Sequence, residues 1–145
     1  MQQRDILGLG IMLALLAGLG LFFAYAPKTS TNQNTFLPVE ITGSSVTVGT
    51  QAGEQALRVS AEIVQPGFVT VHQALGQAPG PVVGQSPLLS VGRHLNLVVT
   101  TTELLLPGSQ YFVLLFVDDG DGIYQAGVDL PVMSDGQVIK QTFSL

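Results

Sequence analysis

An uncharged run of 21 residues, residues 6–26, restricts most strongly what this chain can fold into. A helix rises about 1.5 Å per residue, so such a run spans roughly 30 Å, the thickness of the hydrocarbon core of a bilayer. Phe22, Phe23 and Tyr25 lie near its end, where aromatic side chains favour the headgroup boundary. The run predicts one transmembrane helix within a membrane anchor of residues 1–26, with the rest of the chain outside the cytoplasm.

A cleaved signal peptide is the alternative interpretation of the same run, and it would release the protein as a secreted domain. Ala24, Tyr25 and Ala26 resemble the small-residue cleavage site of such peptides. However, the apolar run exceeds the roughly 7–15 residues of a signal core, and Pro27 would follow the cut directly. We therefore expect a retained, single-pass anchor in the cell membrane.

Gly10, Ala14 and Gly18 recur at every fourth position of this run. They would lie on one helix face and would let a second helix approach closely, which predicts self-association through that face. The other interpretation is that small residues are simply frequent in membrane helices.

A polar linker and a β-domain are predicted after the anchor. Residues 27–35 read PKTSTNQNT and show no apolar periodicity, which is typical of a flexible tether. From residue 36 to residue 145 the pattern is that of short strands. Residues 57–63 alternate apolar and polar side chains, which indicates a strand with one buried face. Residues 39–41 and 46–48 predict a first strand that is broken near Gly43.

Two further segments predict where the core lies. Residues 111–117, YFVLLFV, are apolar on both faces and suit a central strand covered on two sides. Leu95, Leu97 and Val99 alternate with more polar positions, so we expect these three in the core and His94 on the opposite face.

Turn signals separate the predicted strands at intervals of about a dozen residues, which is the pattern of an all-β sandwich or barrel. They fall at residues 66–67, 79–81, 107–108, 119–122 and 135–136. The predicted fold class is all-β: an immunoglobulin-like antiparallel β-sandwich of about seven strands, preceded by the N-terminal transmembrane helix.

Composition and motifs exclude several functions. The formal net charge of −5 argues against nucleic acid, whose binding depends on Lys and Arg. With no cysteine, the chain has no disulfide, no thiolate zinc site and no Cys nucleophile. Ser86 and Ser90 stand in no nucleophile motif, and we expect no enzyme. The two histidines, His72 and His94, would form part of a zinc or copper site only if the fold brought them together; a structural or surface role is the simpler interpretation.

Four aspartates within twelve residues form the candidate site: Asp118, Asp119, Asp121 and Asp129. Carboxylates this close, with Gly120 and Gly122 allowing tight bends, can surround a hard cation such as calcium. The spacing does not match a helix–loop–helix calcium loop, so the metal-binding interpretation is an irregular calcium loop between two strands. The alternative is a hydrated Asp-Gly turn without metal.

The residues also resemble a known family. PGFVTVHQ (66–73), VVGQSPLL (82–89), GRHLNLVV (92–99) and DDGDGIYQAGVDLPV (118–132) follow one another in order. Together they resemble an uncharacterised, immunoglobulin-like β-sandwich domain of archaeal and bacterial cell-surface and secreted proteins. The resemblance covers residues 57–145 and implies an extracytoplasmic module without implying a reaction.

We therefore expect a non-catalytic, membrane-anchored cell-surface module that binds a surface or envelope protein or supports an envelope structure. One alternative is a subunit of a surface appendage in which the N-terminal helix packs as a spine. Another is a calcium-binding or metal-dependent extracytoplasmic domain. These alternatives differ in their partners: a separate protein, further copies of the chain, or a metal ion.

Overall fold

The computed structural model describes residues 37–49, 51 and 55–145, which belong to a compact unit of Thr35–Leu145. The predicted anchor, the linker and the face of Gly10, Ala14 and Gly18 lie outside these residues. Among the residues that are described, no helix is long and apolar enough to cross a membrane.

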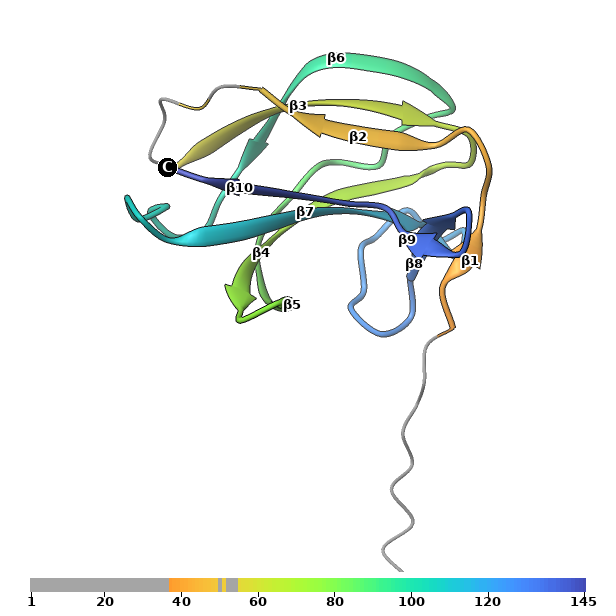
Figure 1. The fold of residues 1–145 in the computed structure, drawn as a ribbon. Coiled ribbons are helices and arrows are strands. Elements are labelled where there is room, and N and C mark those ends of the chain that lie inside the picture. Colours follow the sequence, from red (N-terminus) through yellow and green to blue (C-terminus); the bar gives the residue numbers. More distant parts are fainter. Residues whose placement is uncertain (1–36, 50, 52–54) are drawn as a thin grey trace, which may run out of the picture. The chain divides into compact units, whose positions relative to one another are not determined.

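The described residues form ten strands in two sheets and no helix, which confirms the all-β prediction (Figure 1). The smaller sheet has the order β2-β3-β6. The larger sheet has the order β1-β8-β7-β4-β5, with β10 pairing to β7 and β9 to β8. Their bounds are β1 Val39–Glu40, β2 Ser45–Val48, β3 Ala56–Ile63, β4 Gly67–Leu75, β5 Ala78–Gln85, β6 Gly92–Thr100, β7 Gln110–Val117, β8 Leu130–Ser134, β9 Gln137–Val138 and β10 Lys140–Ser144.

Apolar side chains from both sheets meet in one core. The predicted alternation in β3 is confirmed, because Leu57, Val59, Ala61 and Ile63 are all buried there. The larger sheet contributes alternate residues of its two longest neighbouring strands: Val69 and Val71 of β4, and Tyr111, Val113 and Leu115 of β7. Figure 1 shows β2, β3 and β6 above the layer that contains β4, β7 and β10. The arrangement is therefore sandwich-like.

Strand β7 lies in the middle of the larger sheet, as its sequence predicts. It pairs with β4 along one edge, while β10 and β8 follow one another along the other edge. The residues that point away from the sandwich core are also buried: Phe112 is 2% exposed and Leu114 is 4% exposed. A strand that is apolar on both faces is thus covered on both faces.

The predicted alternation in β6 is wrong at its first half, because the strand contains a β-bulge. Val59 pairs with Leu97 but Ala61 pairs with His94, so Leu95 and Asn96 together oppose one residue of β3. Asn96 has a φ of 54°, the left-handed conformation that Asn tolerates better than most residues. The extra residue reverses the alternation: Leu95 is 58% exposed, and His94 shares the face of buried Ala61. Val99 is buried and Leu97 is partly buried, as predicted.

The first strand is split, as predicted, and its halves enter different sheets. A turn at Gly43, with a φ of 94°, separates β1 from β2. β1 pairs with β8 in parallel, which departs from the purely antiparallel prediction. Ile41 N donates to Met133 O at 2.8 Å, and the Glu40 carboxylate accepts hydrogen bonds from the Asp135 and Gly136 amides.

A tyrosine fixes the connection from β6 to β7. Tyr111, the second residue of β7, is buried, and its hydroxyl accepts a hydrogen bond of 2.8 Å from Leu106 N, five residues upstream. Leu105 of the same connection is also buried. The bond therefore ties the start of β7 to the backbone that crosses between the sheets.

Candidate functional site

Three of the four predicted calcium ligands lie together in the loop between β7 and β8. Asp118, Asp119 and Asp121 each offer a carboxylate oxygen, and these atoms lie within 4.8 Å of one another. Asp119 and Asp121 are exposed and Asp118 is partly buried, so water reaches the cluster. The loop thus presents a compact negative surface at one end of the larger sheet.

Backbone amides hold these carboxylates in place. Gly122 N donates to Asp118 Oδ1 at 3.0 Å, Asp121 N to Asp119 Oδ1 at 3.2 Å, and Ile123 N to Asp121 Oδ1 at 2.7 Å. Such bonds are the local turns that aspartate side chains form with the amides that follow them. The cluster is therefore organised by its own backbone, whether or not a cation binds.

The fourth aspartate has a different position. Asp129 is 1% exposed and accepts hydrogen bonds from Asp119 N at 3.2 Å and Gln125 N at 2.6 Å. Its two oxygens thus each satisfy a backbone amide, and it does not belong to the cluster of three carboxylates. Asp129 joins the two ends of the loop, a role that the spacing in the sequence does not distinguish from that of a ligand.

Tyr124 attaches the same loop to the larger sheet. Its ring packs edge-on against Phe116 and Phe68, with ring centroids 5.3 and 5.7 Å away. Burial, and secondarily the negative charge of Asp129, raises the pKa of Tyr124 to about 12. An apolar contact and a buried carboxylate therefore hold the loop, while its three other aspartates face the solvent side.

The loop has the donors for a hard cation but not a complete coordination shell. Calcium takes roughly six to eight oxygen ligands, and the cluster provides three carboxylates. Asp118 and Asp119 each use only one oxygen in hydrogen bonds within the described part of the chain. Water and backbone carbonyls would have to supply the other ligands.

The two histidines lie in different sheets and make separate hydrogen bonds. His72, in β4, donates from Nδ1 to Gly80 O at 2.8 Å, and its Nε2 accepts from Thr70 Oγ1 at 2.9 Å. His94, in β6, donates from Nε2 to Ser90 O at 2.8 Å. Burial lowers the pKa of His72 although the Gly80 carbonyl acts in the opposite direction. His72 is therefore a neutral, fully hydrogen-bonded residue at neutral pH.

The serines considered as nucleophiles show no adjacent base. Ser86 is 2% exposed, and its hydroxyl accepts a hydrogen bond from Val69 N at 3.0 Å. The Ser90 carbonyl accepts the hydrogen bond from His94, but no bond joins the Ser90 hydroxyl to a described base. The Ser86 hydroxyl therefore satisfies a backbone amide of β4.

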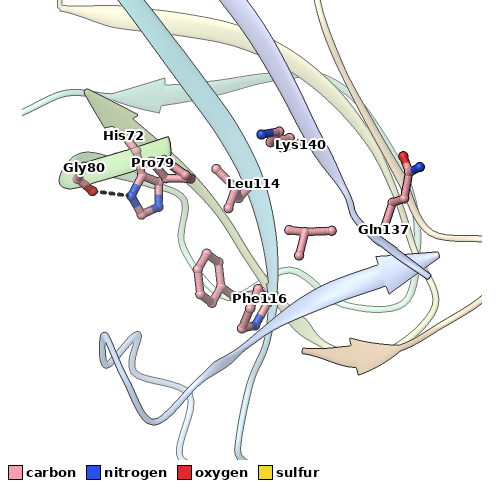
Figure 2. A pocket seen from close by; sticks show the side chains of 9 residues that line it. His72, Pro79, Gly80, Leu114, Phe116, Gln137 and Lys140 are labelled. Carbon is pink, nitrogen blue, oxygen red and sulfur yellow. Dashed lines mark hydrogen bonds between the residues drawn. The ribbon is translucent and has the colours of Figure 1, made fainter. Parts of the chain in front are cut away.

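Sequence reasoning missed a pocket on the outer face of the larger sheet (Figure 2). It has a volume of about 590 Å³ and is lined by His72, Pro79, Gly80, Leu114, Phe116, Pro131, Gln137, Val138 and Lys140. Its floor is the outward face of β4 and β7, where the His72 ring stacks on Phe116 at 6.0 Å. The apolar residues on both faces of β7 pointed to a contact on the outer face of the sheet as well as in the core. On this outer face, β5, β8 and β9 surround the pocket.

A comparison with family models decides the relationship of this fold. Residues 44–145 match the model described as Domain of unknown function (DUF7282). The chain belongs to the DUF7282 family. The match confirms the resemblance to an uncharacterised domain, and the DUF7282 region includes every strand except β1.

The other comparisons add no relative. No curated protein and no solved structure shows a significant match to the chain. The description of the DUF7282 family names no reaction, ligand or partner. Function must therefore be argued from the surfaces and side chains of this DUF7282 domain.

Proposed function

We propose that this chain is a non-catalytic, membrane-anchored module on the cell surface, and that it binds a partner protein along strand β6. The observation that carries the proposal is that β6 is an edge strand with exposed apolar side chains. It is nine residues long, it forms a ladder only with β3 among the described strands, and it presents apolar side chains to solvent. Its other edge meets β5 only at an isolated bridge between Gly84 and Thr101, directly after the strand. The uncharged run of residues 6–26 supports the anchor.

Exposed apolar side chains lie in β6 and in the segments that flank it. Of eleven exposed large apolar side chains in the described residues, two lie in β6 itself, Leu95 and Val98, and three lie in the flanking segments, Val91, Leu104 and Leu106. Val98 is 46% exposed and pairs with Arg58, so it lies on the solvent face of the smaller sheet. Leu95 and Val98 thus give the edge strand apolar surface that a partner could cover.

An edge strand offers a defined way to bind. Its outward N–H and C=O groups can accept an added strand from another protein, while neighbouring side chains give specificity. The bulge at Asn96 interrupts the middle of this edge, which limits a pairing strand to the segments on either side. We propose that the partner is a surface or envelope protein that packs on Leu95 and Val98.

Site-directed photo-cross-linking tests the β6 surface. A photoreactive residue is placed at the exposed position of Arg93 or Thr100 in β6 of the full chain in native membranes, and cross-linked products are identified by mass spectrometry. We expect one discrete heterologous partner that disappears in the Leu95→Gln, Val98→Thr variant. The matched Leu75→Gln, Val64→Thr variant, which changes exposed residues elsewhere, should retain it. A ladder of self-cross-links would favour the appendage subunit, and no specific product would overturn the proposal.

The anchor is tested by membrane extraction and protease protection. We expect the chain to stay in the membrane pellet in alkaline carbonate, and protease added outside the cell to digest the β-domain. A soluble product that begins at Pro27 would support signal cleavage instead. Cross-linking of cysteines introduced at Gly10, Ala14 and Gly18 tests the proposed self-association of the anchor.

We also propose that the sandwich is immunoglobulin-like. The orders β2-β3-β6 and β10-β7-β4-β5 correspond to strands A-B-E and G-F-C-C′ of that architecture. The Tyr111 hydroxyl bonds back to the connection before β7, as in the tyrosine corner at the start of strand F. An experimental structure in which β2 and β6 did not flank β3 would overturn this assignment.

Calcium binding at Asp118, Asp119 and Asp121 is the second candidate function, favoured by the approach of their three carboxylates. Calcium that binds only the folded state stabilises it by about 2.7 kcal/mol at a hundredfold excess over Kd. Extracellular modules bind calcium with Kd near roughly 10⁻⁴–10⁻³ M, so millimolar calcium is a fair test.

Thermal unfolding of the full chain in calcium, magnesium or EDTA separates this function from a plain turn. We expect calcium to raise Tm and EDTA to reverse the increase, with a smaller effect of magnesium, which demands stricter octahedral geometry. The Asp119→Ala, Asp121→Ala variant should lose the response. The Asp135→Ala variant, in the β8–β9 turn, should keep it. Identical melting curves in EDTA and about 10 mM calcium, above the Kd range of such modules, would leave the loop as a hydrated turn.

A further inference from the structure

The pocket on the outer face of the larger sheet has an apolar floor and an uneven polar rim. Leu114, Phe116 and Val138 supply apolar surface, and two prolines, Pro79 and Pro131, supply rigid walls. Its volume of about 590 Å³ lies within the roughly 300–1,000 Å³ that is typical of small-molecule sites. The apolar part would therefore accept a compact apolar group.

His72 cannot provide the polar recognition in this pocket. Both ring nitrogens are already used, by Gly80 O and by Thr70 Oγ1, and the ring is stacked on Phe116. Figure 2 shows His72, Pro79 and Gly80 on one side of the pocket, with Lys140 and Gln137 lying toward the side of β9 and β10. The polar groups that remain available to a ligand are those of Lys140 and Gln137.

Lys140 is a cation without an anionic partner in the described part of the chain. Its Nζ lies 4.9 Å from the centre of the Phe112 ring and 3.4 Å from Gln77 O, and no described carboxylate forms an ion pair with it. An ammonium group has three donors, and a single carbonyl at this distance leaves donors for a further acceptor. The contacts with Phe112 and Gln77 hold the charge over the sheet face that forms the pocket floor, because Lys140 is paired with Leu114.

We propose that this pocket binds a small amphipathic monocarboxylate. The apolar body would lie on Leu114, Phe116 and Val138, and the carboxylate would meet the Lys140 ammonium, with the Gln137 amide as a second donor. One cation and one amide suit the two oxygens of a monoanion. A phosphate group is usually held by several cations or by a row of backbone amides, which this rim does not provide. The site is separate from β6 and does not depend on the proposed protein partner.

A series of three probes tests both halves of the proposal: 3-phenylpropionate, 3-phenylpropanol and 3-phenylpropylammonium. They share one apolar body and differ in the charge of the head group. Each is titrated into the full chain in lipid nanodiscs, and binding is followed by methyl NMR signals of Leu114 and Val138. We expect the carboxylate to bind at least about threefold more tightly than the alcohol, as for a partly exposed ion pair, and the ammonium compound to bind most weakly.

Variants assign this preference to one residue. Lys140→Gln should make the carboxylate and the alcohol bind equally, and Lys140→Glu should reverse the order in favour of the ammonium compound. Arg93→Gln, which removes the same charge from β6 in the other sheet, should preserve the wild-type order. Lys140 is exposed, so we expect its variants to fold normally. Unchanged methyl spectra outside the pocket will show that each variant is folded.

Three results would overturn the proposal. The first is the absence of saturable shifts at Leu114 and Val138 with any probe. The second is equal binding of all three probes to the wild-type chain, which would leave an apolar hollow without anion recognition. The third is a carboxylate preference that survives Lys140→Gln, which would place the anion at another residue.

Discussion

Strands β6 and β7 are similar in length, with nine and eight residues, yet their surroundings are opposite. β7 is paired along both edges and buried on both faces, whereas β6 is paired along one edge and exposes the apolar side chains of Leu95 and Val98. The sequence of β7 contains no interruption, while that of β6 contains Asn96 in a left-handed conformation. Strand position in a sheet and apolar content together determine how much each side chain contributes to stability.

The largest expected difference between the two strands is in the cost of truncating a leucine. Leu115 in β7 is 1% exposed, so Leu115→Ala should lower the free energy of unfolding by about 2–5 kcal/mol. Leu97 in β6 is only partly buried, and Leu97→Ala should cost about half as much because less contact is lost. Urea denaturation of the full chain measures both values. Equal costs would show that β6 is as well packed as β7.

The bulge in β6 should be the next most sensitive position. Asn96→Val places a β-branched residue at a φ of 54°, which should cost about 1–2 kcal/mol because this conformation is strained for such residues. Asn96→Gly, which accepts the same φ, is the control and should be close to neutral. Denaturation of both variants measures the difference. If valine were tolerated as well as glycine, the bulge would not be a constraint on β6.

His72 in β4, next to β7, should contribute to the change of the free energy of unfolding with pH. Because burial lowers its folded pKa below the ordinary value of 6.5, the unfolded chain binds the proton more readily. The stability that neutral His72 contributes to the folded state is therefore complete above pH 6.5. It is lost as the pH falls from 6.5 through the lower pKa of the folded state, because the unfolded chain takes up the proton first. Urea denaturation between about pH 5.5 and 7 should give a smaller slope for His72→Gln than for the wild type.

The matched variant for this test is His94→Gln in β6. It removes the other histidine of the chain but retains His72, and it should therefore keep the slope that is due to His72. NMR titration of the His72 ring should give a midpoint below 6.5. A midpoint at or above 6.5 would contradict the burial that the structure assigns to this side chain.

The smallest expected effect is at Leu95 of β6. This leucine is 58% exposed, so Leu95→Gln should change the free energy of unfolding by no more than about 0.5 kcal/mol. The sequence alternation alone would place it in the core and predict a loss several times larger. Thermal and urea denaturation decide between these two values, and a large loss would mean that β6 continues without a bulge.

Much of the fold was predictable because it follows from local patterns. Alternation marks β3, apolar residues on both faces mark β7, and Gly43 marks the break between β1 and β2. The bulge was not predictable from alternation, since it depends on how β6 registers with β3. The local signal was an asparagine between the two leucines of the strand.

The candidate site was predictable in part for the same reason. Three aspartates that are close in sequence are also close in space, because short turns keep them together. Asp129 separates from them because its role depends on the backbone amides of Asp119 and Gln125, which spacing cannot show. The pocket combines residues from β4, β5, β7, β8, β9 and β10, and only the strand order brings these together.

The short parallel pair of β1 and β8 would have a mechanical consequence in the membrane-anchored protein that we propose. Val39–Glu40 is the first strand along the described chain, so tension applied from the N-terminal side reaches it before any other strand. Two residue pairs, the Ile41–Met133 bond, the Glu40 carboxylate and the burial of Ile41 resist its removal. Under load, this strand would peel away while the sandwich from β2 onward stays intact. The extended segment between the membrane and the domain would thereby lengthen by a few residues, about 3.3 Å each, before force acts on the core.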